Sequence, residues 1–101
     1  MSGKKFLASV SVNAIDDYQV LAGNIAEARK ARKFSQREMA SRCLMSLATY
    51  QAIENASLTV SFGAVLAVLD VLELTHTLRD VAGPHLDSEG RALRASMRIR
   101  R

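Results

Sequence analysis

Three serines, Ser35, Ser46 and Ser61, constrain the fold most, because each stands directly before a short segment with helical apolar spacing. Serine is a favoured helix N-cap, since its hydroxyl accepts a hydrogen bond from an unpaired backbone N–H of the first turn. Ser35 is also followed three residues later by Glu38, which completes a capping box. The pattern predicts short helices that start at these serines, the last of them over residues 62–72.

Each of these helices is expected to bury one face. The apolar residues recur three or four positions apart, which is the spacing of one side of a helix. The predicted core positions are Met39, Ala40, Cys43, Tyr50, Ile53, Phe62, Val65, Leu66 and Leu69.

The flanking segments carry weaker signals. Asp16, with Gln19 three residues on, predicts the start of an earlier helix over residues 18–33. Residues 1–14 alternate loosely and fit either a short strand or an unstructured arm. Residues 74–81 fit either a fifth short helix or a strand, ended by Gly83 and Pro84. Residues 88–97 fit a basic helix.

The composition favours helices throughout. The chain has 101 residues, one domain's worth, and alanine and leucine supply much of its 49% apolar content. We therefore predict an all-α fold, with an N-terminal arm over 1–15, a five-helix domain over 16–83 and a basic C-terminal helix or tail over 84–101. The single cysteine, Cys43, cannot form a disulfide within the chain, so a cytoplasmic setting is expected. We expect neither a signal peptide nor a membrane-spanning segment.

Charge is distributed unevenly along the chain. Residues 20–56 hold six Lys or Arg against three acids, and residues 57–90 hold one Arg against five acids. Residues 91–101 hold five Arg and no acid. This distribution indicates contact with a polyanion at one or both basic ends. The basic residues expected around the central unit are Arg32, Lys33, Arg37 and Arg42.

Residues 25–74 resemble the lambda-repressor-like Xre (Cro/CI) helix-turn-helix proteins. The resemblance rests on Arg29, Phe34, Ser35, Gln36, Met39, Ala40, Ser46, Thr49, Tyr50, Ile53, Glu54 and Asn55. It implies a lambda-repressor-like domain whose recognition helix, at about 46–54, lies in the major groove of DNA. More weakly, residues 58–78 resemble HipB-type antitoxins, in which a helix-turn-helix dimer represses its own operon and holds a toxin kinase.

The resemblance also implies roles for individual residues. An ion pair between Arg29 and Glu54 would join the first and third helices. The implied DNA-binding residues are Lys33, Gln36, Arg37, Ser46, Leu47, Ala48, Thr49, Gln51, Ala52 and Asn55. Among them Gln36, Ser46 and Asn55 are expected on phosphates.

Two features depart from the family pattern. Leu47, Ala48 and Ala52 offer no hydrogen bonds, so they can contact only thymine methyl groups or fit the shape of the groove. Gln51 and Thr49 remain as the polar candidates, and we expect phosphate contacts and DNA shape to carry more of the discrimination. Leu44 stands where the family usually has a glycine. Either it adopts a positive φ, at about 1 kcal/mol or more, or the turn is reshaped.

Residues after the motif carry more apolar surface than a small core can hide. The residues expected to mediate self-association are Val68, Val71, Leu72, Leu74 and Leu78. A homodimer would match the two-fold operators of the resembled family.

These observations predict a sequence-specific DNA-binding transcription regulator. It would be a nucleoid-associated autorepressor with double-stranded DNA as its partner, and with a toxin as a second partner if it is an antitoxin. The alternative is a module that binds a partner protein through its apolar third helix. RNA binding would rest on the arginine-rich tail alone. We expect no enzyme activity, cofactor or metal site, because His76 and His85 lack suitable neighbours.

Overall fold

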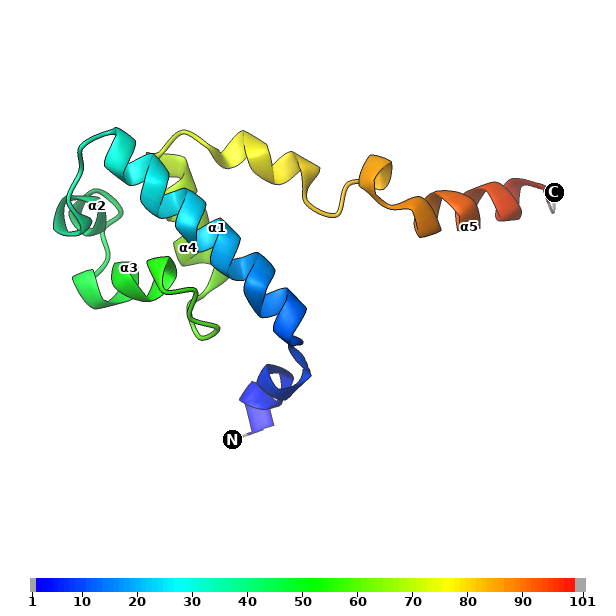
Figure 1. The fold of residues 1–101 in the computed structure, drawn as a ribbon, viewed down its shortest axis with the longest axis horizontal. Coiled ribbons are helices and arrows are strands. Elements are labelled where there is room, and N and C mark those ends of the chain that lie inside the picture. The colour runs from blue at the N-terminus through cyan, green and yellow to red at the C-terminus, as the bar shows by residue number, and fades with distance from the viewer. Residues whose placement is uncertain (1, 100–101) are drawn as a thin grey trace.

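Residues 2–99, the part of the chain that this computed structural model describes, contain five α-helices and three 3₁₀ helices joined by short turns and loops (Figure 1). The α-helices are α1 (Val12–Ala31), α2 (Gln36–Arg42), α3 (Leu47–Glu54), α4 (Phe62–Val71) and α5 (Ser88–Ile99). The 3₁₀ helices are η1 (Ser2–Ser9), η2 (Thr75–Asp80) and η3 (Pro84–Leu86). No strand occurs in these residues, which confirms the all-α prediction. None of these helices has the length and apolar character needed to cross a bilayer.

The three serine caps are confirmed. The hydroxyls of Ser35, Ser46 and Ser61 accept hydrogen bonds from backbone N–H groups three residues on, at 3.0, 3.1 and 3.0 Å. The Glu38 carboxylate in turn accepts from the Ser35 backbone N–H at 3.0 Å, so the capping box is complete. These caps fix where α2, α3 and α4 begin.

The start of α1 differs from the prediction. The helix begins at Val12 and is capped by Ser11, whose hydroxyl accepts from the Ala14 N–H at 3.1 Å. Asp16 therefore lies inside the helix, because Ser11 supplies the same cap more than a turn earlier. The described part of residues 1–14 forms η1 and the start of α1, and neither expected alternative is correct. A strand at the N-terminus would need a second strand to pair with, and residues 2–99 contain none. The helical turns of η1 instead let backbone N–H and C=O groups form hydrogen bonds locally.

The core lies where α1 to α4 meet. Its largest fully buried side chains are Tyr50, Met39, Ile53, Leu72 and Val68. As predicted, α2 contributes Met39 and Ala40 with Cys43 at its end, and α3 contributes Tyr50 and Ile53. The core thus uses one face of α3 and leaves the opposite face exposed.

Helix α4 is rotated relative to the prediction. Phe62 and Leu66, expected in the core, are 67% and 41% exposed. Val68 and Leu72, expected at a dimer interface, have no exposed surface and belong to the protein's own core. The remaining interface candidates are partly buried against that core, namely Val71, Leu74 and Leu78. Helix α4 is apolar on nearly every side, so its periodicity was compatible with burial of either of two faces. Packing against the other helices decides which face is buried.

The ends of α1 to α4 share one backbone device. Each helix is followed by a residue with positive φ, namely Lys33 (60°), Leu44 (55°), Ala56 (56°) and Glu73 (60°). The backbone N–H of the next residue then donates to the carbonyl five positions earlier, as in the bond from Met45 N to Ala40 O at 3.0 Å. This is the Schellman motif, in which glycine is the usual residue. No glycine among the described residues has a positive φ. Of the two alternatives expected at Leu44, the first is confirmed: Leu44 adopts a positive φ, and the turn keeps the Schellman hydrogen bond.

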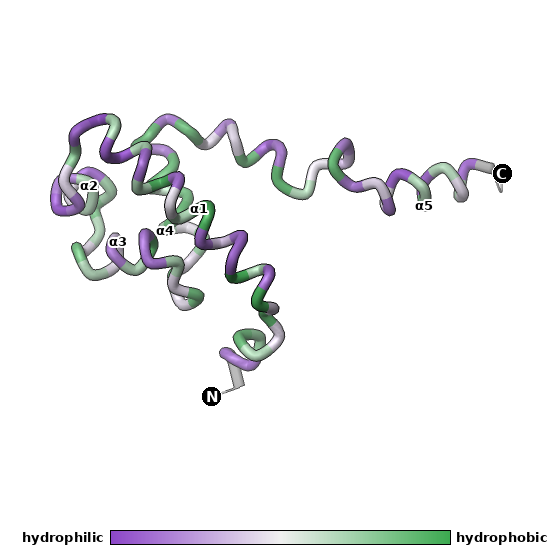
Figure 2. Tube along the Cα trace, in the orientation of Figure 1, coloured by the Kyte–Doolittle hydropathy of each residue, from purple (hydrophilic) through white to green (hydrophobic). Residues whose placement is uncertain are grey.

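The chain after α4 extends away from the helical core. Residues 74–81, predicted as a short helix or strand, form η2, and the predicted basic helix is α5. Figure 1 shows α5 projecting far from α1 to α4, with η3 as its main neighbour. The radius of gyration is 17.2 Å, whereas a compact chain of this length has about 13 Å. The hydropathy trace in Figure 2 shows apolar residues continuing into this extension.

Candidate nucleic-acid interface

The candidate interface is formed by α2, α3 and the turn between them. Tyr50 and Ile53 fasten α3 to the core, while Ala48, Gln51 and Asn55 are exposed on its outer side. Leu47, Thr49 and Ala52 are partly buried. The Ser46 hydroxyl is exposed but engaged, because it caps α3 and donates to the Thr49 hydroxyl at 2.9 Å. Ala48 and Gln51 are therefore the accessible ones among the predicted base-contacting positions, whereas Leu47, Thr49 and Ala52 are partly buried.

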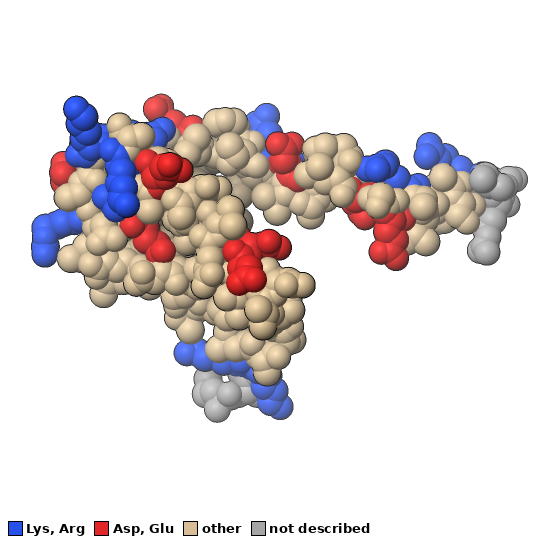
Figure 3. Space-filling model, in the orientation of Figure 1, with Lys and Arg blue, Asp and Glu red and all other residues tan. Residues whose placement is uncertain are grey.

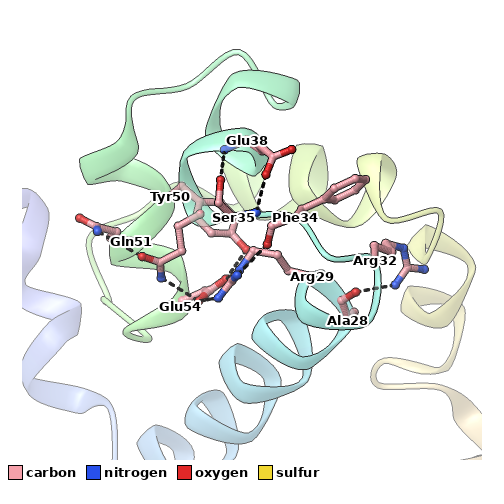
Figure 4. A network of polar contacts seen from close by, with 10 residues as sticks. Ala28, Arg29, Arg32, Phe34, Ser35, Glu38, Tyr50, Gln51 and Glu54 are labelled. Carbon is pink, nitrogen blue, oxygen red and sulfur yellow. Dashed lines mark hydrogen bonds and ion pairs between the residues drawn. The ribbon is translucent and has the colours of Figure 1, made fainter.

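A nearly buried ion pair joins α1 to α3. Arg29 Nε donates to Glu54 Oε2 at 2.7 Å, and its Nη2 donates to Glu54 Oε1 at 3.2 Å (Figure 4). Arg29 Nη1 also donates to the backbone oxygen of Phe34 at 2.8 Å, where the chain enters α2. One guanidinium thus ties together the three helices that place the interface.

Glu54 is the centre of this network. Besides Arg29, its carboxylate accepts from the Tyr50 hydroxyl and from Gln36 Nε2, the latter at 2.9 Å. Burial raises the pKa of Glu54, but hydrogen bonds from Arg29, Tyr50 and Gln36 outweigh it and hold the pKa below its usual value. Burial, with the Glu54 carboxylate beside it, raises the pKa of Tyr50. The network is therefore a carboxylate surrounded by donors at neutral pH.

The network reaches the exposed face of α3 through two glutamines. Gln36 Oε1 accepts a hydrogen bond from Gln51 Nε2 at 3.2 Å, while Nε2 of the same Gln36 amide donates to Glu54 Oε1 at 2.9 Å. The sequence predicts a phosphate contact for Gln36 and does not predict its contact with Gln51. Helical spacing reports which residues share a face of one helix, but it does not report pairs between two helices.

The predicted ring of basic residues divides into two kinds. Arg32 donates to the backbone oxygens of Ala28 at 2.8 Å and Leu72 at 2.9 Å, and Arg42 lies 4.1 Å from the centre of the Phe34 ring. The side chains of Lys33 and Arg37 are exposed and make no hydrogen bond or ion pair within residues 2–99. Figure 3 shows Lys and Arg gathered at the end of the molecule where α1 meets α2.

The sequence model of a helix-turn-helix domain family matches residues 20–82, which include α2, the turn and α3. The chain belongs to this helix-turn-helix domain family, within the Xre (Cro/CI)-like group. Neither curated proteins nor solved structures give a significant match. The domain is associated with DNA binding and transcription regulation, and its family is typically non-enzymatic. The match does not single out HipB-type antitoxins among its members.

Proposed function

We propose that this helix-turn-helix protein is a dimeric repressor that binds double-stranded DNA at its own promoter, with α3 in the major groove. The observation that carries the proposal is the exposed Gln51 amide, anchored through Gln36 to the buried pair of Arg29 and Glu54. A polar side chain that is fixed on the accessible side of a recognition helix is suited to reading a base edge.

The amide of Gln51 keeps the groups that adenine recognition needs. A glutamine amide has two N–H donors and a carbonyl acceptor, and only one of those donors is engaged with Gln36. The carbonyl and the second N–H can then form the paired contact that Gln makes with adenine. Because Gln36 already restrains the side chain, less rotational freedom is lost on binding. Ala48 and Ala52 beside it are small enough for close approach and can contact thymine methyl groups.

Phosphate contacts would position the protein without selecting a sequence. Arg37 in α2 and Lys33 just before it have exposed side chains, and Ser46 and Asn55 flank α3. Gln36 retains one amide hydrogen beyond its bond to Glu54, so it can still donate to a phosphate. With one anchored amide among apolar neighbours, DNA shape contributes much of the discrimination.

Fluorescence anisotropy with a duplex of the protein's own promoter and a scrambled duplex, over a salt series, tests this function. Gln51→Ala should lower the preference for the promoter by about 1–3 kcal/mol and barely change binding to the scrambled duplex. Gln19→Ala is the matched control, because Gln19 is an exposed glutamine on α1 away from the motif. Full preference in the Gln51→Ala variant would contradict readout by α3. An absence of binding even at low salt would overturn DNA binding itself.

A second candidate function is an antitoxin or other partner-protein module, and Leu44 is the observation that favours it. This leucine is 95% exposed in the turn before α3, and contact with a partner protein would remove its apolar surface from water. The product of the adjacent gene, co-expressed with the chain, provides the test. Leu44→Asp should abolish their complex and leave the fold intact, because aspartate tolerates positive φ better than leucine. A stable complex with the Leu44→Asp variant would exclude this surface.

A further inference from the structure

Helix α5 displays an apolar pair that its own chain does not cover. Leu93 and Met97 lie one turn apart and are 60% and 70% exposed. Arg94 and Arg98 form a parallel basic row on the adjacent side of the same helix. An isolated helix of twelve residues is marginally stable in water. Contact with another surface would therefore stabilise α5.

The segment before α5, residues 83–87 (called the elbow below), directs α5 away from α1 to α4. Arg91 Nη1 donates to the backbone oxygens of His85 at 2.6 Å and Pro84 at 3.1 Å. Gly83 is buried in the elbow, where an added Cβ would lie 2.7 Å from the His85 ring. These contacts hold α5 against η3, its main neighbour. In this arrangement α5 projects away from the chain's own core and leaves Leu93 and Met97 exposed (Figure 1).

An open groove runs along the exposed side of α4. Its volume is about 530 Å³, and it is lined by Gly63, Leu66, Ala67, Asp70 and Thr75. A Cβ added to Gly63 would meet only the Ser61 hydroxyl, at 3.8 Å, so packing within the chain does not require glycine there. Glycine is unfavourable inside a helix, but it allows another chain to approach closely. The groove thus combines a small floor, an apolar side chain and a carboxylate.

We propose that α5 of one copy docks in the α4 groove of a second copy, and that the second copy's α5 docks reciprocally. Leu93 and Met97 would pack on Leu66 and the floor at Gly63, with the arginine row beside Asp70. The charges agree, since Asp70 is the one charged residue that lines the groove, whereas α5 carries Arg91, Arg94 and Arg98 beyond its first-turn Glu89. Arg100 and Arg101 lie outside the described residues. This exchange supplies the interface of the proposed dimer, and it can be tested without DNA.

Sedimentation equilibrium of the full chain tests the apolar contact. The native protein should be a dimer, and Leu93→Asp with Met97→Asp should weaken the dimer at least tenfold while α1 to α4 melt as before. Gly63→Leu should also weaken the dimer, because the leucine side chain fills the groove. Since leucine favours a helix more than glycine does, this variant should not destabilise α4 itself. Val12→Asp is the control, because Val12 is an equally exposed apolar residue at the start of α1. A dimer unaffected by both interface variants would overturn the proposal.

Charge reversal tests the pairing of α5 with the groove. One variant carries Asp70→Arg, and the other carries Arg94→Glu with Arg98→Glu. Each alone should be weakened as a dimer, because like charges then meet at both contacts. An equimolar mixture should form heterodimers, because both contacts become complementary again. A mixture that stays monomeric would contradict the pairing.

Cross-linking distinguishes docking of α5 in the groove of a second copy from docking in the groove of its own chain. A chain with Leu66→Cys and Leu93→Cys should oxidise to covalent dimers, and the buried native thiol of Cys43 should not compete. A cross-linked monomer would show that α5 covers its own groove and would overturn the exchange. If the α5 variants of Leu93, Met97, Arg94 and Arg98 remain dimeric but lose salt-sensitive DNA binding, α5 contacts DNA and the exchange is overturned. If the protein dimerises through α5 as expected but does not bind its promoter, the proposed function is wrong and the proposed interface still holds.

Discussion

Arg29 of α1 and Glu54 of α3 lie 2.7 Å apart (Nε to Oε2), with only 10% and 7% of their side chains exposed. Every other contact of the Glu54 carboxylate comes from a residue of the helix-turn-helix unit itself, Gln36 or Tyr50. The pair therefore fixes how the interface sits on α1. It also connects the stability of the domain to the position of its recognition helix.

Replacing Glu54 by glutamine should destabilise the protein strongly. Glu54→Gln leaves the guanidinium of Arg29 nearly buried without a counter-charge, and breaking a buried pair from one side costs about 3–5 kcal/mol. Urea unfolding followed by circular dichroism measures this loss. Glu27→Gln, on the exposed side of α1, should change the free energy of unfolding by less than about 0.5 kcal/mol. A loss below about 1 kcal/mol for Glu54→Gln would show that the pair contributes little.

The same carboxylate should make stability sensitive to acid. Its pKa in the folded protein lies below the ordinary value of 4.5, so the unfolded chain binds more protons as the pH falls. The free energy of unfolding should stay level above about pH 5 and fall as the pH drops through 4.5 towards the folded pKa. Urea titrations between pH 7 and 3 measure this. The slope should be shallower in Glu54→Gln, and an unchanged slope would assign the acid sensitivity to other carboxylates, such as Glu38.

Glycine at position 44 should stabilise the fold. Leu44 has a φ of 55° and is almost fully exposed, so Leu44→Gly removes backbone strain of about 1 kcal/mol or more and loses little packing. Thermal unfolding measures the gain. Leu44→Ala should change little, because alanine also carries a Cβ at positive φ. Ala48→Gly, inside α3, should lose about 1 kcal/mol. Equal effects of Leu44→Ala and Leu44→Gly would attribute the change to the leucine side chain rather than to φ.

Arg37→Ala should lower the salt dependence of DNA binding. Each neutralised phosphate adds about 0.9 to the log–log slope, so losing Arg37 from both subunits of a dimer should reduce the slope by about 2. Anisotropy titrations over a salt series measure the slope. Arg79→Ala, an exposed arginine of η2 away from the motif, should leave it unchanged. Equal slopes for the native protein and Arg37→Ala would remove Arg37 from the phosphate contacts.

The parts of the fold that the sequence predicts well depend on local chemistry. Ser35, Ser46 and Ser61 cap helices through bonds to residues only three positions away, and the buried faces of α2 and α3 follow from spacing within each helix. The start of α1 was predicted wrongly because Ser11 and Asp16 are both able to cap. Local pattern alone does not rank two competent caps five residues apart.

The features that the sequence did not reveal depend on contacts between elements. Phe62 and Val68 both belong to helical apolar rows of α4, and only packing on the other helices decides that Val68 is buried. Likewise, Gln51 meets Gln36 because α2 packs against α3. Arg29 and Glu54 are 25 positions apart, so local spacing does not predict their ion pair. It was anticipated only from the family resemblance.

The positive φ angles that end α1 to α4 bear on how long the protein persists in a cell. Each non-glycine side chain at these positions raises the energy of the folded state, and 1 kcal/mol changes the ratio of unfolded to folded molecules about fivefold. Cellular proteases degrade mainly the unfolded fraction. Substitutions at Lys33, Leu44, Ala56 and Glu73 would therefore adjust the turnover rate of the protein. Turnover could change in this way while the residues that anchor Gln51 stay the same.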